Sequence, residues 1–365
     1  MRKAVALLFA AFLCLSSFAQ TANYAISGKV IDAVTKQPLE LASVFAQNTT
    51  IGTITAVDGS FMLSLPAGGY TLVITFVDYQ TVTKRISMAE VQGKNISIEL
   101  SRNENLLQDI IVASSNEVKD GWAKYGTFFL DNFIGKTKNS SSCKLVNKEV
   151  LKFYFSKKRN SLKVMAEAPL EILNEAFGYT IKYTLDSFTF DYNTMVTAYQ
   201  GYPLFIDMQA TDSVTTNNWA TARLNSYKGS MLHFMRSLYN KQLKEEGFEI
   251  KFLIKEGHKE KAIPLLNYYN AMNYAKNDST LTATILPVQT EVAVLYRNAK
   301  PEWSFVAEAI TTTAKYQESA LSFTPDEPVM VAVNGYYFDP ASITKSGYLS
   351  WKRLADMLPY DFKPQ

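Results

Sequence analysis

Hydrophobic and polar residues alternate with a period of two through much of residues 25–100, which is the pattern of strands that bury one face. The alternation is regular in Phe61–Leu65 and again in Tyr70–Phe76. Asp58-Gly59 and Pro66–Gly69 precede these two segments, and both provide residues that are favoured in turns. A series of about seven short strands separated by frequent turns predicts a β-sandwich.

The pattern changes after residue 120, where helical and strand periods follow one another. Aromatic residues recur at helical spacing from Trp122 to Phe133, with Asp120 as the expected N-terminal cap and Gly135 as the stop. A longer helix is predicted from Asn218 to about Glu246. Strands are predicted at Leu151–Ser156, Ser161–Ala166, Tyr179–Phe190, Thr194–Met208, Phe248–Lys255, Ile285–Arg297, Glu302–Thr312 and around Val329–Val333.

The predicted fold is therefore mainly β with an α+β part. A seven-stranded sandwich comes first, and a larger α+β domain with antiparallel strands and one long helix follows it. We expect the sandwich at residues 24–101, a linker or last strand at 102–120, and the α+β domain at 121–365. Hydrophobic residues make up 47% of the chain, which is enough for buried cores in both parts.

The first 19 residues have the pattern of a signal peptide. Two cationic residues precede the apolar run Ala4–Leu15, which is shorter than the ~20 residues that a membrane span needs. Ser17 and Ala19 are small residues at the −3 and −1 positions, so cleavage is predicted between Ala19 and Gln20. We therefore expect an exported protein with no transmembrane segment after the signal is removed.

Charge and cysteine content narrow the class of protein further. The net charge of +3 includes Arg2 and Lys3, which the predicted cleavage removes, so no nucleic-acid partner is expected. Cys14 leaves with the signal and Cys143 then stands alone, which rules out an intramolecular disulfide.

Several landmarks of the front segment occur in a recognisable order: Gly28-Lys29-Val30-Ile31-Asp32, Ala42-Ser43-Val44, Thr55-x-x-Asp58-Gly59-x-Phe61-x-Leu63 and Pro66-Ala67-Gly68-x-Tyr70-x-Leu72. This part of the chain resembles the carboxypeptidase-regulatory-like domain of Bacteroidota envelope proteins. The resemblance implies a transthyretin-like sandwich without catalytic function. Asp78 departs from the pattern, because the family usually has glycine before the aromatic residue. The second domain resembles uncharacterised proteins that carry the same front domain.

The chain lacks the residues of a zinc carboxypeptidase. Such an enzyme needs His-x-x-Glu and a second histidine. The chain has two histidines, His233 and His258, and neither begins that motif. We therefore expect no carboxypeptidase activity, no metal site and no cofactor.

Four polar residues share one face of the long predicted helix: Arg223, Ser226, Ser230 and His233. They are candidate ligand-binding residues, although a solvated or internally satisfied helix face gives the same pattern. Ser230 and His233 are spaced as helical neighbours, but a serine nucleophile also needs a third orienting group and an oxyanion site. No Gly-x-Ser-x-Gly segment occurs, so no catalytic residue is assigned.

The leading hypothesis is a non-catalytic exported envelope protein whose sandwich positions a larger domain that binds a partner or ligand. The partner would be an envelope protein or a glycan, in the periplasm, at the outer membrane or at the cell surface. One alternative is an envelope hydrolase of glycan or peptide, with an unrecognised pair of carboxylates such as Asp186 and Asp191. Another is an accessory to outer-membrane nutrient uptake.

Overall fold

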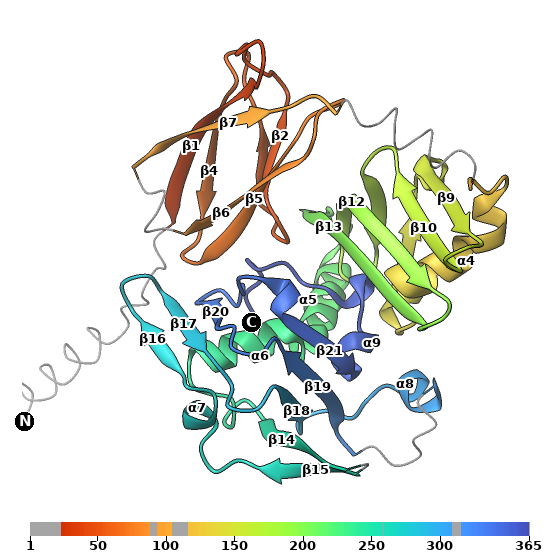
Figure 1. The fold of residues 1–365 in the computed structure, drawn as a ribbon. Helices are drawn as coiled ribbons and strands as arrows, with labels where there is room; N and C mark the ends of the chain where they lie inside the picture. The colour runs from red at the N-terminus through yellow and green to blue at the C-terminus, as the bar shows by residue number, and fades with distance from the viewer. Residues whose placement is uncertain (1–22, 88–92, 104–115, 258, 309–314, 365) are drawn as a thin grey trace, which may run out of the picture.

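The computed structural model describes residues 23–87, 93–103, 116–257, 259–308 and 315–364 (Figure 1). The predicted signal peptide, with Ala19 and Gln20, lies outside the described residues. Residues 104–115 of the predicted linker and His258 also lie outside them. No helix in the described ranges is long and apolar enough to cross a membrane.

The front of the chain forms a sandwich of two sheets, as predicted. One sheet has the order β4-β1-β7, with β1 and β7 parallel, and the other has the order β3-β2-β5-β6. Their buried faces enclose one apolar cluster that includes Ile26, Leu63 and Tyr70. The bounds are β1 Tyr24–Asp32, β2 Ser43–Ala46, β3 Gly52–Ile54, β4 Ser60–Leu65, β5 Gly69–Thr75, β6 Val82–Ser87 and β7 Asn95–Leu100.

Two of the sequence landmarks have a structural role in the sandwich. The Asp32 carboxylate accepts hydrogen bonds from the Val34 and Thr35 N–H groups and from the Tyr79 hydroxyl. These bonds, that of Tyr79 first, hold the pKa of Asp32 below its usual range. Asp78 has a φ of 65°, so it adopts the left-handed conformation that glycine supplies in the family pattern. The departure at Asp78 therefore leaves the turn geometry intact.

The next part packs a helix on an antiparallel sheet. Helix α4, Gly121–Phe133, covers a six-stranded sheet with the order β8-β11-β12-β10-β9, in which β13 also pairs along the length of the central strand β12. Phe129 and Phe133 of the helix are fully buried in the cluster beneath it. The strands are β8 Cys143–Leu145, β9 Leu151–Ser156, β10 Ser161–Ala166, β11 Leu170–Asn174, β12 Tyr179–Asp191 and β13 Val196–Asp207, and short 3-10 turns lie at Asn139–Ser142 and Lys148–Val150.

The remaining residues form a separate apolar cluster that includes Phe234 and Phe248, although Tyr227 and Leu354 pack in the cluster beneath α4 instead. This part of the chain forms a five-stranded sheet, β15-β14-β18-β19-β21, and a three-stranded sheet, β16-β17-β20. The strands are β14 Phe248–Glu256, β15 Lys259–Pro264, β16 Ala275–Asn277, β17 Thr282–Ile285, β18 Glu291–Tyr296, β19 Gln317–Phe323, β20 Val329–Ala332 and β21 Ile343–Gly347. The helices are α5 Ser213–Tyr227, α6 Met231–Tyr239, α7 Tyr268–Ala271, α8 Trp303–Glu308 and α9 Tyr348–Trp351, with 3-10 turns at Pro340–Ser342 and Leu354–Asp356.

The prediction of one long helix was wrong, because two helices meet at a turn. Helix α5 ends at Tyr227 and α6 begins at Met231 and ends at Tyr239. Gly229 lies in the turn with a φ of 72°, a left-handed conformation that a helix interior cannot contain. The apolar residues keep helical spacing across this turn, so the sequence pattern gave no sign of the break.

Three further local predictions need correction. Asp120 has a φ of 55° and its side chain makes no capping bond. The segment predicted as a strand from Glu302 is helical at Trp303–Glu308, and its end lies outside the described residues. The strand predicted at Ile285–Arg297 is interrupted, because β17 ends at Ile285 and β18 begins at Glu291.

A loop of the sandwich adds to the free edge of β13 and to the C-terminal segment. The Asn48 N–H donates to the Pro203 carbonyl at 2.7 Å, and the Phe205 N–H donates to the Thr49 carbonyl at 2.9 Å. The Tyr360 N–H donates to the Asn48 carbonyl at 2.7 Å. The C-terminus therefore lies in the middle of the molecule, below the sandwich (Figure 1).

A second contact lies beside the first at the same end of the sandwich, because the Gln47 N–H donates to the Thr71 carbonyl at 2.8 Å. The Asn334 side chain donates to the Gly69 carbonyl at 3.0 Å and accepts from the Gly69 N–H at 3.3 Å. Thr71 and Tyr336 share a hydrogen bond, and Arg85 forms an ion pair with Asp339. The sandwich is thus held to the remainder of the chain at two places by directional bonds.

Candidate functional site

The turn between α5 and α6 separates the four residues that the sequence placed on one face. Arg223 and Ser226 lie on α5, Ser230 is the N-terminal cap of α6, and His233 lies in the first turn of α6. Their side chains make four different sets of contacts. The prediction that they share one helix face is therefore wrong.

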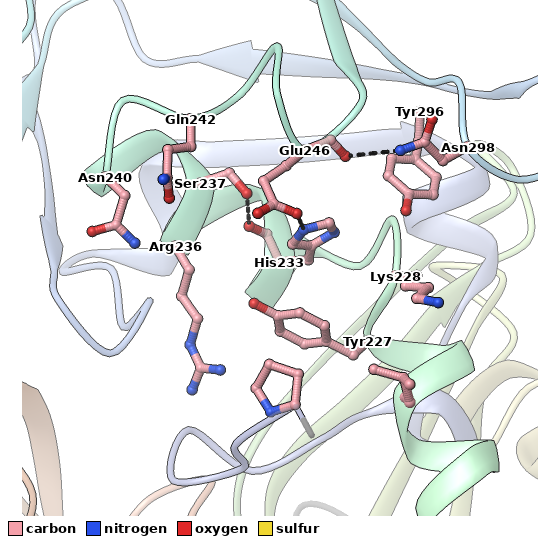
Figure 2. A pocket seen from close by; sticks show the side chains of 12 residues that line it. Tyr227, Lys228, His233, Arg236, Ser237, Asn240, Gln242, Glu246, Tyr296 and Asn298 are labelled. Carbon is pink, nitrogen blue, oxygen red and sulfur yellow. Dashed lines mark hydrogen bonds and ion pairs between the residues drawn. The ribbon is translucent and has the colours of Figure 1, made fainter. Parts of the chain in front are cut away.

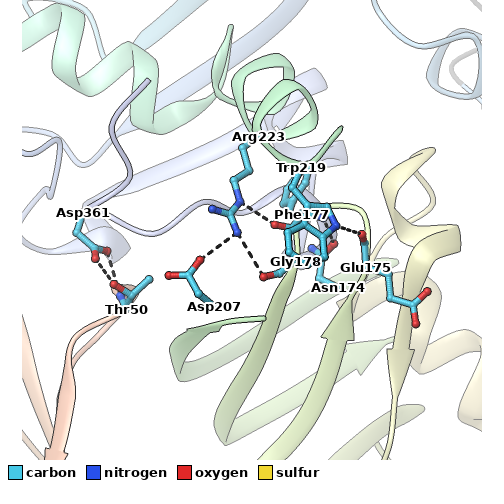
Figure 3. A network of polar contacts seen from close by, with 9 residues as sticks. All are labelled: Thr50, Asn174, Glu175, Phe177, Gly178, Asp207, Trp219, Arg223 and Asp361. Carbon is cyan, nitrogen blue, oxygen red and sulfur yellow. Dashed lines mark hydrogen bonds and ion pairs between the residues drawn. The ribbon is translucent and has the colours of Figure 1, made fainter. Parts of the chain in front are cut away.

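Arg223 anchors α5 to the six-stranded sheet (Figure 3). Its Nε donates to the Phe177 carbonyl at 2.7 Å, and Nη2 donates to Asp207 Oδ1 at 3.0 Å. The guanidinium also lies over the Tyr179 ring at 3.8 Å from the centroid, a cation–π contact. These partners occupy most of its hydrogen-bonding capacity.

Neither serine is placed as a nucleophile. The buried Ser226 hydroxyl donates to the Asp356 carbonyl at 2.9 Å. The Ser230 hydroxyl accepts from the backbone N–H of His233 at 3.1 Å, so it contacts the peptide and not the imidazole ring. This is a helix-capping contact. A Ser–His pair with the geometry of acyl transfer is therefore absent from these residues.

Both ring nitrogens of His233 have partners. The Gly229 N–H donates to Nδ1 at 3.1 Å, which places the ring proton on Nε2, where it faces Glu246 Oε2 at 3.0 Å. The ring packs between Tyr227 and Phe248, with centroids at 4.7 and 4.9 Å. Burial lowers the pKa of His233, although Glu246 opposes the shift. The imidazole is accordingly neutral at pH 7.

A cavity of about 370 Å³ opens beside this histidine (Figure 2). We call it the His233 cavity. Its buried floor consists of Tyr227, His233, Ser237 and Tyr296, and its exposed rim includes three side-chain amides. The lining residues are Leu224, Tyr227, Lys228, His233, Arg236, Ser237, Asn240, Gln242, Glu246, Tyr296, Asn298 and Pro364.

The charges around the His233 cavity are unequal. Lys228 and Arg236 are cationic, and Glu246 is its one lining carboxylate. Arg236 is half-buried and donates from Nε to the Asn334 carbonyl and from Nη2 to the Tyr360 carbonyl, each at 3.0 Å. Among the described residues, neither cation has a carboxylate within 4.0 Å.

A second cavity of about 320 Å³ also borders the C-terminal segment. We call it the Arg223 cavity. It holds two carboxylates, Asp207, which pairs with Arg223, and Asp361, which accepts from the Thr50 N–H at 3.0 Å (Figure 3). The lining residues are Thr50, Tyr179, Asp207, Ala220, Arg223, Leu224, Pro359, Asp361, Phe362 and Lys363.

Sequence reasoning missed Arg236 and Glu246 as site residues. Arg236 follows His233 by three positions, so helical spacing could have identified it. Glu246 follows a turn that the sequence had assigned to the long helix. Within the described ranges, no three His, Cys, Asp or Glu residues lie close enough to hold a metal ion.

Comparison with known proteins identifies the front of the chain. Residues 26–112 match the family model of the CarboxypepD_reg-like domain, so this segment carries that domain and the predicted resemblance is confirmed. Among curated proteins, the TonB-dependent receptor SusC of Bacteroides thetaiotaomicron is 31% identical over 108 residues. That match covers 30% of this chain, and the chain spans only 10% of the length of SusC.

Solved structures give weak matches. A putative membrane-associated protein of unknown function from Bacteroides fragilis covers 90% of this chain and 96% of its own, at 11% identity and a TM-score of 0.19. A DUF3823 family protein from Bacteroides ovatus covers 52% of this chain and 82% of its own, at 12% identity and a TM-score of 0.18. TM-scores this low carry no argument about the fold or function of this chain.

Proposed function

We propose that the protein is a non-catalytic component of the bacterial cell envelope, in which the sandwich binds a partner protein and is held in a fixed position on the larger α+β part. The signal-like residues 1–19, the CarboxypepD_reg-like domain and the similarity to a TonB-dependent receptor support an envelope location. The candidate polar residues support a non-catalytic role, because they are engaged in helix capping and anchoring.

The observation that carries this proposal is the unprotected edge of β4. Edge strands usually carry charges that prevent pairing with other chains. In the sandwich, β6 carries Lys84 and Arg85 and β7 carries Glu99, but β4 is uncharged over its six residues. Met62, at the centre of β4, is 69% exposed. The contacts to the α+β part use other segments, and among the described strands β4 pairs with β1 alone, so its second edge has no ladder partner and could accept an added strand beside β3.

The neighbouring surface is apolar as well. Leu41 and Ile54 are 62% and 58% exposed, and Ile54 belongs to β3, the edge strand that lies beside β4. Exposed apolar residues gathered at a strand edge are typical of a surface that is covered in the assembly. The proposed partner therefore presents an extended segment with apolar side chains.

The test uses the full chain with a C-terminal tag, expressed in a Bacteroidota host and cross-linked in the cells. We expect it in the envelope fraction, with a reproducible partner, and a TonB-dependent receptor is the partner class that the SusC similarity favours. Met62→Glu should abolish the cross-link. Met195→Glu is the matched control, since Met195 is 70% exposed but lies on another domain. A cytoplasmic protein, or equal cross-linking of both variants, would refute the proposal.

A hydrolase is the second candidate, favoured by the two carboxylates of the Arg223 cavity. A glycosidase needs one carboxyl group as an acid and a second as base or nucleophile. Asp207 and Asp361 are the residues that would have to serve. Asp191, suggested by the sequence, instead accepts from the Asn193 N–H in an exposed turn. Turnover of an envelope glycan that Asp207→Asn and Asp361→Asn each abolish would establish the hydrolase.

A further inference from the structure

The His233 cavity has an uncompensated positive charge. Arg236 is half-buried, and its two bonded acceptors are neutral carbonyl oxygens and not carboxylates. A guanidinium removed from water is normally paired with an anion. Lys228 adds a second positive charge at the rim of the same cavity, whose floor includes His233.

The single carboxylate of the cavity cannot balance both cations. Glu246 is about half-exposed, and its Oε2 already accepts the proton that His233 donates from Nε2. The remaining rim groups Asn240, Gln242 and Asn298 are amides, which contribute hydrogen-bond donors without charge. The arrangement is therefore rich in donors and positive in net charge.

We propose that the His233 cavity binds a small organic anion, whose carboxylate or phosphate group contacts Lys228 and Arg236. Arginine suits both groups, because its planar fork donates two parallel hydrogen bonds to them. The volume of about 370 Å³ accommodates a body of roughly one ring, which would pack against the buried Tyr227 and Tyr296 side chains of the floor. This site is separate from the proposed partner edge on β4.

The experiment is calorimetric titration of the full mature chain with four probes: inorganic phosphate, glucose 6-phosphate, glucuronate and uncharged glucose. At least one anion should bind with a Kd below about 10 mM and about tenfold more tightly than glucose. Glucuronate and glucose 6-phosphate decide between carboxylate and phosphate. Raising NaCl from about 50 to 500 mM should weaken the binding, because salt screens the attraction.

Two substitutions with opposite expected effects on affinity distinguish a change in binding from a loss of folded protein, because misfolding could only weaken binding. Lys228→Gln should weaken anion binding about fivefold, and Glu246→Gln should strengthen it by a similar factor, because one removes a positive and the other a negative charge. Lys244→Gln is the control, since Lys244 is exposed but does not line the cavity. Equal affinity for glucose, no binding of any anion at 10 mM, or shifts of the same sign in both variants would overturn the proposal.

Discussion

Replacing Asn334, whose side chain bonds the backbone of Gly69, tests whether directional hydrogen bonds hold the sandwich in place. Asn334→Ala removes one bond to the Gly69 carbonyl and the two bonds that the side-chain oxygen accepts from the Gly69 and Tyr336 N–H groups, and Asn334 is only 9% exposed. Each lost bond costs about 1 kcal/mol, and a buried group left without a partner costs about 1–3 kcal/mol. Some of these groups will reach water at the boundary between the sandwich and the α+β part, which we call the seam. We therefore expect the free energy of unfolding to fall by about 2–4 kcal/mol in total.

Urea unfolding followed by two probes measures this loss. The four tryptophans all lie after residue 120, so their fluorescence reports the α+β part, whereas circular dichroism reports every strand. In the wild type the two transitions should coincide, and in Asn334→Ala the sandwich should separate from the rest. Asn193→Ala is the control, because its side chain also makes two hydrogen bonds, but these join two exposed turns, at Asn193 and at Arg159–Asn160, away from the sandwich. An Asn334→Ala protein with unchanged transitions would refute the account of the seam.

Three further predictions concern the region around the turn and the free thiol. Burial lowers the pKa of His233 below 6.5, so the folded state takes up a proton less readily than the unfolded state, and the free energy of unfolding should fall as the pH drops below that value. His233→Gln should reduce this fall between about pH 7.5 and 5.5. A variant with the same pH dependence as the wild type would contradict the prediction. Gly229→Ala should cost about 2–4 kcal/mol in urea unfolding, because a Cβ would meet the Gln317 side chain at 2.5 Å, whereas Gly93→Ala, with a similar φ and nothing within 4 Å, should cost about 1 kcal/mol. Burial raises the pKa of the Cys143 thiol to about 12, so a disulfide reagent should label it at least about 100-fold more slowly in the folded protein than in guanidinium, and fast native labelling would contradict this.

The sandwich could be predicted from the sequence because its signals are local. Each strand alternates within itself, and each turn contains its own glycine or aspartate, so no distant contact is needed to recognise them. The hairpin of Leu151–Ser156 and Ser161–Ala166 was predicted with the bounds that the structure has, for the same reason. Asp78 shows the limit of such prediction, because aspartate can adopt the left-handed conformation but its presence in a sequence does not indicate that it does.

The break between α5 and α6 could not be read from periodicity. Gly229 and Ser230 together weaken a helix by only about 1–2 kcal/mol, which tertiary contacts can offset. The turn is decided by packing, because Gly229 lies against Tyr296 and Gln317, residues from distant strands. The same turn brings the N–H of Gly229 to His233, so the tautomer of the histidine also depends on this long-range contact.

Arg236 connects the His233 cavity to the position of the sandwich. Through Nε it holds the carbonyl of Asn334, whose side chain bonds Gly69, and through Nη2 it holds the carbonyl of Tyr360, whose N–H bonds Asn48. An anion that contacted the guanidinium would either compete for these donors or strengthen their bonds to the two carbonyls. Anion binding and attachment of the sandwich would therefore be thermodynamically coupled. Replacing Arg236 therefore alters both at once, and for that reason Lys228 and Glu246, which take no part in the seam, are the residues that separate ligand binding from domain attachment.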